Sequence, residues 1–143
     1  MADVEMVGMD DLIQKLEKLG NQGYVEDVGK KMVDAAYPMT EAAVKSALAS
    51  VETGPYATGS VSASITGTGT KVNAYGVYAV ARPTGRDSKG VSNGAKAAFL
   101  QYGSPKKNPK LHARPWRQKA VNSVQDSAVK TMEEVLKSEM ELD

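Results

Sequence analysis

Two stretches of the chain carry apolar residues at spacings of three and four, which place them on one face of an α-helix. In the stretch that ends near residue 51 these positions are Val25, Val28, Met32, Ala35, Met39, Ala43 and Ala47. In the stretch from Pro115 to about Met140 they are Val121, Val124, Ala128, Met132, Val135 and Leu136. Two long helices are therefore predicted. Pro115 suits the first helical position because its missing N–H would have no partner there.

Pro38 lies in the middle of the first long stretch. Proline lacks the N–H of a helical hydrogen bond and disfavours helical geometry in the residue before it. We therefore predict a kink near Tyr37 or a break into two helices. The turn-forming sequence Thr53-Gly54-Pro55 predicts the end of the stretch.

Two shorter helices are predicted on the same grounds. Near the N-terminus one helical face carries Leu12, Ile13, Leu16 and Leu19. Asp10 or Asp11 is the expected N-cap of this helix, and Gly20 is expected to end it. The alternation from Asp3 to Gly8 weakly indicates a short edge strand before it. Between residues 95 and 102, the spacing of Ala98, Phe99 and Tyr102 favours a short helix over a strand.

Residues 58–81 are rich in Ser, Thr, Gly and Val, which favours strands over helices. Val61–Thr66 and Lys71–Arg82 are the predicted strands, with Gly67-Thr68-Gly69 as the turn between them. The second strand is apolar on both faces from Tyr75 to Ala81, so we expect it to be covered on both sides, one of them by another subunit. The predicted class is α+β, with a small antiparallel sheet against a long kinked helix and a long C-terminal helix.

Two polar segments are predicted to be mobile loops. Residues 82–94 read RPTGRDSKGVSNG and hold too little apolar area to order themselves in isolation, so we expect a partner to hold them. Residues 104–113 are rich in Pro and Lys. With both loops included, residues 1–143 are predicted to form a single domain, because most domains contain about 100 to 150 residues.

The composition indicates a thin hydrophobic core. The 143 residues include one Phe, one Trp and six Tyr, so most of the core has to be built from Val, Leu, Met and Ala. Small side chains suit close helix packing but bury little area each. We therefore expect a partner subunit to complete part of the apolar surface.

The chain has no cysteine, which excludes disulfides and thiolate metal sites. It also lacks an apolar run of about 18 residues and the basic-then-apolar order of a signal peptide. The sequence therefore predicts a soluble protein that is made and used without export and has no membrane partner.

Charge is balanced overall but segregated locally. Eighteen basic residues against seventeen acidic ones argue against a surface devoted to nucleic acid. One short span nevertheless concentrates basic side chains: Lys106, Lys107, Lys110, Arg114, Arg117 and Lys119. The end of the last predicted helix is acidic, and we expect it to project. The basic span has three possible roles: a solvated loop, a binder of DNA phosphates, or a partner for the acidic helix end of a neighbouring copy.

No combination of residues predicts a catalytic centre. His112 is the only histidine and stands among lysines without a nearby carboxylate. Ser104 and Lys107 have S-x-x-K spacing, but the companion motifs S-D-N and K-T-G are absent. Gly67 to Lys71 lacks the spacing of a phosphate-binding loop. We predict no enzymatic activity, no cofactor and no metal site.

Trp116 allows two interpretations. A tryptophan just before a helix is typically structural, and its indole N–H finds a nearby carbonyl. An aromatic residue beside arginine is also typical of interface hot spots. The candidate interface residues are Phe99, Tyr102, Gly103, Arg114, Pro115 and Trp116. The candidate DNA-facing or intersubunit residues are Lys106, Lys107, Lys110, Arg117 and Lys119.

Four short motifs, taken in order, resemble a known family. They are Gly8-Met9-Asp10-Asp11-Leu12, Thr58-Gly59-Ser60-Val61-Ser62-Ala63-Ser64-Ile65, Ala98-Phe99-Leu100-Gln101-Tyr102-Gly103-Ser104, and Ala113-Arg114-Pro115-Trp116. Together they resemble the small tail-component family of long-tailed bacteriophages and prophages, which are head-tail joining or tail-completion proteins of the neck. The chain departs from the family pattern at Val61 (usually Leu), Gln101 (usually Glu), Ser104 (usually Thr) and Trp116 (usually Phe).

The resemblance implies a structural virion protein, assembled in the bacterial host cytoplasm and located in the neck. Its partners would be further copies of itself in a ring, expected to be a hexamer, together with the head connector or head-completion protein and the tail-tube or tail-terminator protein. Contact with DNA in the channel is also implied. The alternative from the residues alone is a DNA-binding module that uses the basic loop at 104–119.

Overall fold

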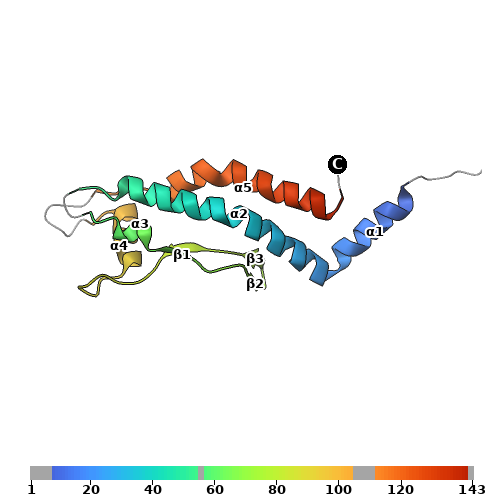
Figure 1. Ribbon diagram of the computed structural model, residues 1–143, viewed down its shortest axis with the longest axis horizontal. Coiled ribbons are helices and arrows are strands. Elements are labelled where there is room, and N and C mark those ends of the chain that lie inside the picture. Colours follow the sequence, from blue (N-terminus) through green and yellow to red (C-terminus); the bar gives the residue numbers. More distant parts are fainter. Residues whose placement is uncertain (1–7, 55–56, 105–111, 142–143) are drawn as a thin grey trace, which may run out of the picture.

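The computed structural model describes residues 8–54, 57–104 and 112–141 and has an elongated α+β architecture (Figure 1). The elements in order are α1 (Met9–Gly20), α2 (Gln22–Val51), α3 (Ser60–Ala63), β1 (Ile65–Gly67), β2 (Lys71–Asn73), β3 (Gly76–Tyr78), β4 (Ala81–Pro83), α4 (Asn93–Tyr102) and α5 (Arg117–Glu139). Helices α2 and α5 lie side by side, the strands lie on the other side of α2, and α1 projects at one end. The predicted α+β class is confirmed.

Helix α2 runs without interruption from Gln22 to Val51, with Pro38 inside it. The predicted alternative of two separate helices is therefore wrong. Pro38 is exposed, so water can bond the backbone carbonyl that loses its helical partner at this position. The helix starts at Asn21, whose side-chain oxygen accepts a bond from the Tyr24 N–H over 3.1 Å. It ends before Thr53-Gly54, as predicted.

The acidic end of α5 does not project, contrary to expectation. Tyr24 donates a hydrogen bond to the Glu139 carbonyl over 3.0 Å, and Lys31 forms a 2.9 Å ion pair with the Glu139 carboxylate. Met140 is buried beside them. These contacts hold the end of α5 against α2. Pro115 is not the first helical residue either, because Trp116 takes the N-cap position and α5 begins at Arg117.

The strands form two short two-stranded antiparallel sheets that follow one another in a single hairpin, residues 65–83, here called the ribbon. Strand β1 pairs with β4, and β2 pairs with β3. Between the two ladders, residues 68–70 face residues 79–80, so one strand carries an extra residue in the manner of a β-bulge. Thr68 fills this position: its N–H donates to the Val80 carbonyl, and its hydroxyl accepts the Val80 N–H.

Two predictions about the strands are wrong. The turn lies at Ala74-Tyr75 and not at Gly67-Thr68-Gly69, because the Asn73 side chain accepts the N–H groups of Tyr75 and Gly76 and Gly76 takes a φ of 136°. Residues Ser60–Ala63 form a helical turn and not the start of a strand. The Glu52 carboxylate accepts the N–H groups of Val61 and Ser62, at 3.1 and 3.0 Å, and so stabilises that turn from outside.

The ribbon is covered on one side by α2, while parts of its other surface are open. Val77 is half-buried and approaches Gly29 of α2, whereas Val72 and Val80 are each 42% exposed. Tyr75, at the turn, is 98% exposed. Coverage of the second side by another subunit stays a prediction.

The core lies where α2, α3, β1, α4 and α5 meet, at the end of the molecule away from α1. Its members are mostly small: Ala47, Leu48, Val61, Ile65, Ala97, Trp116 and Ala120. Leu48 is completely buried, and Trp116 is by far the largest side chain in the cluster. The core is thus narrow, as the composition predicted.

Helix α1 is confirmed, but its start differs from the prediction. Gly8 takes the N-cap position with a φ of 87° and no side-chain cap, so Asp10 and Asp11 are not the cap. Both lie in the first turn, where carboxylates interact favourably with the helix dipole. The predicted edge strand falls on residues outside the described part of the chain, apart from Gly8, which lies in a turn.

Gly67 packs so closely under Tyr37 that a side chain cannot fit. A Cβ at Gly67 would overlap the hydroxyl and ring of Tyr37. We expect Gly67→Ala to lower the free energy of unfolding by about 1–3 kcal/mol, the usual cost of overpacking, measured by urea denaturation. Gly94→Ala is the matched control, because a Cβ there meets nothing within 4 Å. Adding Tyr37→Phe should recover part of the loss; unchanged stability of Gly67→Ala would contradict the packing.

Candidate interface at the junction of helices α4 and α5

The C-terminal end of α4 and the N-terminal end of α5 lie together and contain most of the candidate site residues. Gly103 ends α4 with a φ of 75°, and its N–H donates to the Phe99 carbonyl over 2.7 Å. The Arg114 N–H donates to the Leu100 carbonyl, also over 2.7 Å. The chain therefore leaves α4 and returns to its side before α5 begins. Lys106, Lys107 and Lys110 lie outside the described residues.

Arg114 is engaged within the chain. Its guanidinium donates to the Val51 carbonyl and to the Thr53 hydroxyl, each over 3.0 Å. Val51 is the last residue of α2, and a cation is favourable beside the unpaired carbonyls at a helix C-terminus. The structure thus gives Arg114 a structural role in joining the end of α2 to the start of α5.

Trp116 is 5% exposed, and its indole N–H donates to the Ala97 carbonyl over 3.0 Å. This is the structural interpretation that the sequence allowed. A buried side chain cannot be a direct contact for a neighbour in this conformation, so Trp116 contributes to the surface by positioning the residues around it. Pro115, which precedes it, is exposed.

Gln101 has a structural role in the junction that the sequence did not predict. Its side-chain oxygen accepts the N–H groups of Trp116 and Arg117, both over 3.0 Å. It therefore caps the N-terminus of α5 from another helix. The signal was present: Gln101 stands where the resembled family has Glu, and both side chains offer an oxygen acceptor.

The outward-facing part of the junction consists of Phe99, Tyr102, Pro115 and Arg117, here called the junction surface. Phe99 is 39% and Tyr102 67% exposed. The Arg117 guanidinium donates to the Tyr102 hydroxyl over 3.1 Å and lies 5.7 Å from the Tyr102 ring and 5.4 Å from the Trp116 ring. Lys119 instead donates to the Ser50 hydroxyl over 2.8 Å. The junction surface is therefore aromatic and cationic.

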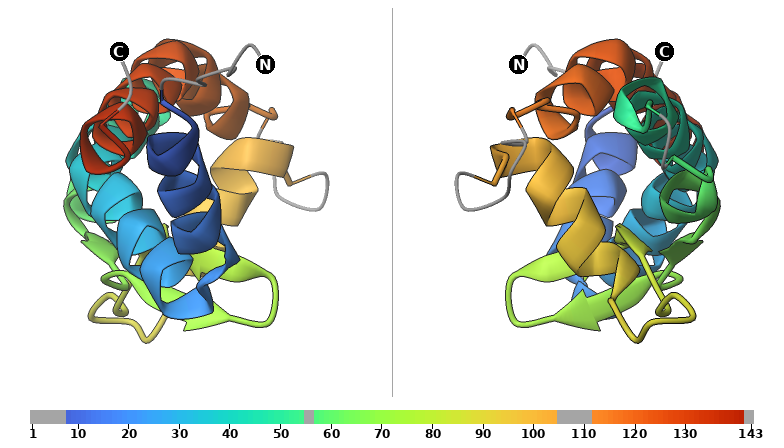
Figure 2. Two further views of the ribbon diagram at one scale, coloured as in Figure 1. Left: turned by 90° about the vertical axis from the view of Figure 1, so that its right-hand side faces the viewer. Right: turned by 90° about the vertical axis from the view of Figure 1, so that its left-hand side faces the viewer.

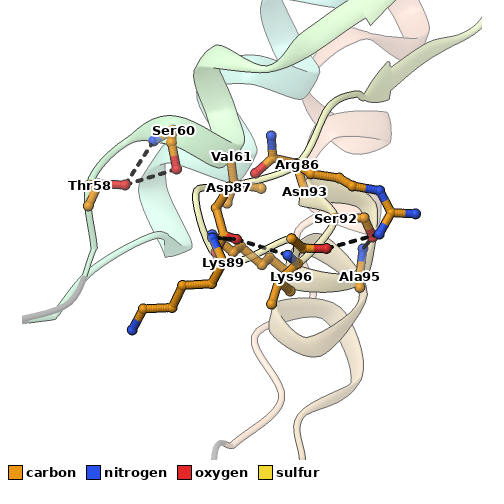
Figure 3. Close-up of polar contacts among 12 residues, drawn as sticks. Thr58, Ser60, Val61, Arg86, Asp87, Lys89, Ser92, Asn93, Ala95 and Lys96 are labelled. Atoms are coloured by element: carbon orange, nitrogen blue, oxygen red, sulfur yellow. Dashed lines mark hydrogen bonds and ion pairs between the residues drawn. The ribbon is translucent and has the colours of Figure 1, made fainter.

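The predicted loop at 82–94 overlaps β4 and α4 at its ends; residues 84–92 form the connection between them, which is organised around Asp87 beside the start of α4 (Figure 3). The Asp87 carboxylate accepts the N–H groups of Lys89 and Val91 and forms a 2.7 Å ion pair with Lys96. Lys96 and these N–H groups hold the pKa of the Asp87 carboxyl below its usual value. The Ser92 hydroxyl caps α4 by accepting the Ala95 N–H. The loop thus has its own polar network; its mobility stays a prediction.

No arrangement of side chains in the described part of the chain suggests catalysis. Among those residues no group of three or more His, Asp or Glu could hold a metal ion. His112 is exposed. Burial, together with the neighbouring Glu41, raises the pKa of Tyr37 from 10.0 to about 12, so its hydroxyl is not a candidate general base at neutral pH. None of the helices in the described ranges is long and apolar enough to span a membrane.

Comparison of the chain with protein-family models, with curated proteins and with solved structures finds no match. The function therefore has to be inferred from the surfaces of the molecule and from the motifs it carries.

The Gln101 cap predicts a matched pair of stability effects. Gln101→Ala leaves two N–H groups at the start of α5 without their acceptor and should lower the free energy of unfolding by about 1 kcal/mol. Gln101→Glu keeps the acceptor and adds a negative charge at a helix N-terminus, so stability at neutral pH should be equal or higher. Gln118→Ala, on the exposed surface of α5, is the control and should change stability by less than about 0.5 kcal/mol. Equal effects of Gln101→Ala and Gln118→Ala would contradict the cap.

The Asp87 network predicts an acid-sensitive contribution to stability. Because the folded pKa lies below the ordinary value of 3.8, the ionised carboxylate stabilises the fold. This contribution is complete above pH 3.8 and is lost as the pH falls through the folded pKa. The stability difference between the native chain and Asp87→Asn should therefore shrink on acidification, measured by urea denaturation from pH 7 to pH 3. A difference that is independent of pH would contradict the role of the charge.

Proposed function

We propose that the chain is a structural subunit of the neck of a long-tailed phage, where it forms a ring that joins the head connector to the tail. The proposal is supported first by where the resemblance motifs lie in the fold. Val61 and Ile65 come from the second motif, and Trp116 comes from the fourth. All three belong to the same core cluster, with Leu100 of the third motif packed against it. Three of the four motifs that carry the resemblance thus contribute residues to the core cluster or pack against it, whereas the first motif lies at the start of α1, which has no buried residue.

The second support is the balance between core and exposed apolar surface. The core is narrow, while large apolar side chains remain exposed on α1, on the ribbon and on the junction surface. Contiguous exposed apolar surface on a small protein is typical of sites that bind other proteins. An elongated subunit of this kind suits an assembly in which neighbours cover what its own core does not.

Ring closure requires two different surfaces on each copy, because the interfaces of a ring are heterologous. The junction surface is the basic candidate. For the acidic candidate, Glu139 is already paired with Lys31. The exposed carboxylates on and just after α5 are Asp126, Glu133, Glu134 and Glu141. We infer that some of these carboxylates pair with Arg117 of a neighbouring copy, whereas Lys106, Lys107 and Lys110 lie outside the described residues.

The alternative function is a DNA-binding module that uses the basic loop. Arg117 is exposed at the start of α5 and supports this possibility. Two observations weaken it: Arg114 is engaged by Val51 and Thr53, and Lys119 donates to Ser50. The groups that remain for phosphate contacts are fewer than the sequence suggested.

Electron microscopy of particles assembled with and without the protein tests the proposed function. Heads that carry a connector should join tails only when the protein is supplied, and it should appear as ring density at the neck. Tyr102→Ala combined with Arg117→Ala should abolish incorporation while leaving the circular dichroism spectrum unchanged. Lys89→Ala is the control. Heads and tails that join equally well without the protein would remove the proposal.

Duplex binding measured against salt concentration tests the alternative. A DNA-binding module should bind at low salt and weaken steeply as salt rises, with a loss on combining Lys106→Ala and Lys107→Ala. Under the neck proposal the native chain should show no such salt-dependent binding to the duplex. Lys89→Ala, which removes one exposed positive charge, is the control.

A further inference from the structure

Helix α1 presents an apolar face that nothing in the described part of the chain covers. Leu12, Ile13, Leu16 and Leu19 lie on this face and are 44–57% exposed, and no residue of α1 is buried. The helix projects from one end of the body (Figure 1), and it lies at the front when that end faces the viewer (Figure 2, left). A strongly amphipathic helix with an open apolar face is typical of a surface that docks into a partner.

The connection between α1 and α2 prevents α1 from folding back along α2. A single residue, Asn21, joins the two helices. Its N–H donates to the Lys18 carbonyl, and its carbonyl and side-chain oxygens accept the N–H groups of Val25 and Tyr24. Antiparallel helices need connections of about two to five residues. Lys15 also donates to the Glu141 carbonyl, which holds α1 towards the end of α5.

A groove of about 490 Å³ lies between the first half of α2 and the tip of the ribbon. Its apolar lining includes Val25, Met32, Val33, Val72 and Val77, and Glu26 is the charged residue among its lining. The α2 residues along it run from 22 to 33, a length of roughly 18 Å at 1.5 Å per residue. Helix α1 has 12 residues and the same length. Groove and helix therefore match in length and in apolar character.

We propose that α1 of one copy docks its apolar face into this groove of a second copy. The occupant is a second copy because the chain itself supplies a helix of the right length and character and holds that helix away from its own groove. Each copy then offers one helix and one groove, so the contact is heterologous and repeats from copy to copy. The contact between α1 and the groove does not depend on the proposed neck function. Only the closure of these contacts into a ring rests on it.

Disulfide trapping between copies tests this arrangement, since the chain has no native cysteine. A Leu16→Cys chain is mixed with a Val72→Cys chain that carries a mass tag, and the mixture is oxidised mildly. The proposal predicts a mixed disulfide between the two chains, well above the yield from Gln14→Cys, on the opposite face of α1, mixed with Val72→Cys. Disulfides only between two Leu16→Cys chains would overturn it in favour of an α1–α1 contact. Equal yields from both mixtures would also overturn it.

A chain that carries both Leu16→Cys and Val72→Cys separates docking between copies from docking within one. The proposal predicts disulfide-linked multimers from this chain. A monomeric, internally linked product would show that α1 reaches its own groove and would overturn the proposal.

The oligomeric state in solution gives an independent readout. Light scattering after size-exclusion chromatography should show association of the native chain that Leu16→Glu reduces at least tenfold and Gln14→Glu leaves unchanged. Leu16 is 57% exposed, so the glutamate does not enter the core of the subunit. A native chain that is monomeric at all concentrations, with no mixed disulfide, would overturn the inference. If the mixed disulfide forms between copies but the protein does not join heads to tails, the neck function alone is rejected and the contact between α1 and the groove stands.

Discussion

Burial of the Trp116 indole is the interaction on which the rest of the structure depends. Its N–H bonds the Ala97 carbonyl of α4, and its ring packs with Leu48 of α2 and Ala120 of α5 in the core cluster. Most of the other core members are alanines and valines, which bury little area each. Large aromatic side chains in cores typically account for about 3–5 kcal/mol when truncated to alanine. Without this side chain, the elements at that end of the molecule would have little to hold them together.

Sequence patterns identified the helices because their signals are local. The spacing of apolar residues defined α1, α2, α4 and α5, with errors of a few residues at their ends. The strand predictions failed where a distant or special contact decided the geometry. Glu52 stabilises the helical turn at Ser60–Ala63 from outside it, and Asn73 moves the hairpin turn to Ala74-Tyr75. Neither contact is visible in a pattern of apolar and polar residues.

The candidate interface shows the same difference between local signals, which the sequence carries, and distant contacts, which it does not. The sequence pointed to the segment from Phe99 to Trp116, and the structure brings the ends of that segment together. The structural interpretation of Trp116 was one of the two that the sequence allowed, and its indole N–H does donate to a nearby carbonyl. The sequence did not predict that Arg114 bonds inward, because its partner Val51 in α2 is far away in the chain. The sequence also did not predict the role of Gln101, because its side chain meets the N–H groups of Trp116 and Arg117 only when the end of α4 lies beside the start of α5. The junction surface of Phe99, Tyr102, Pro115 and Arg117 remains exposed.

The narrow core stabilises each subunit at one end. We propose that neighbouring copies cover α1 and the tip of the ribbon. Hydrogen–deuterium exchange of the free chain and of the chain in the proposed neck assembly tests this most directly, because it reports protection of each segment in both states. The account predicts that the amides around Ala97 and Ala120 are protected in both states. It also predicts that those of α1 and of residues 72–78 become protected only on assembly. Fast exchange of α1 in the assembled neck, or no protection around Trp116 in the free chain, would contradict it.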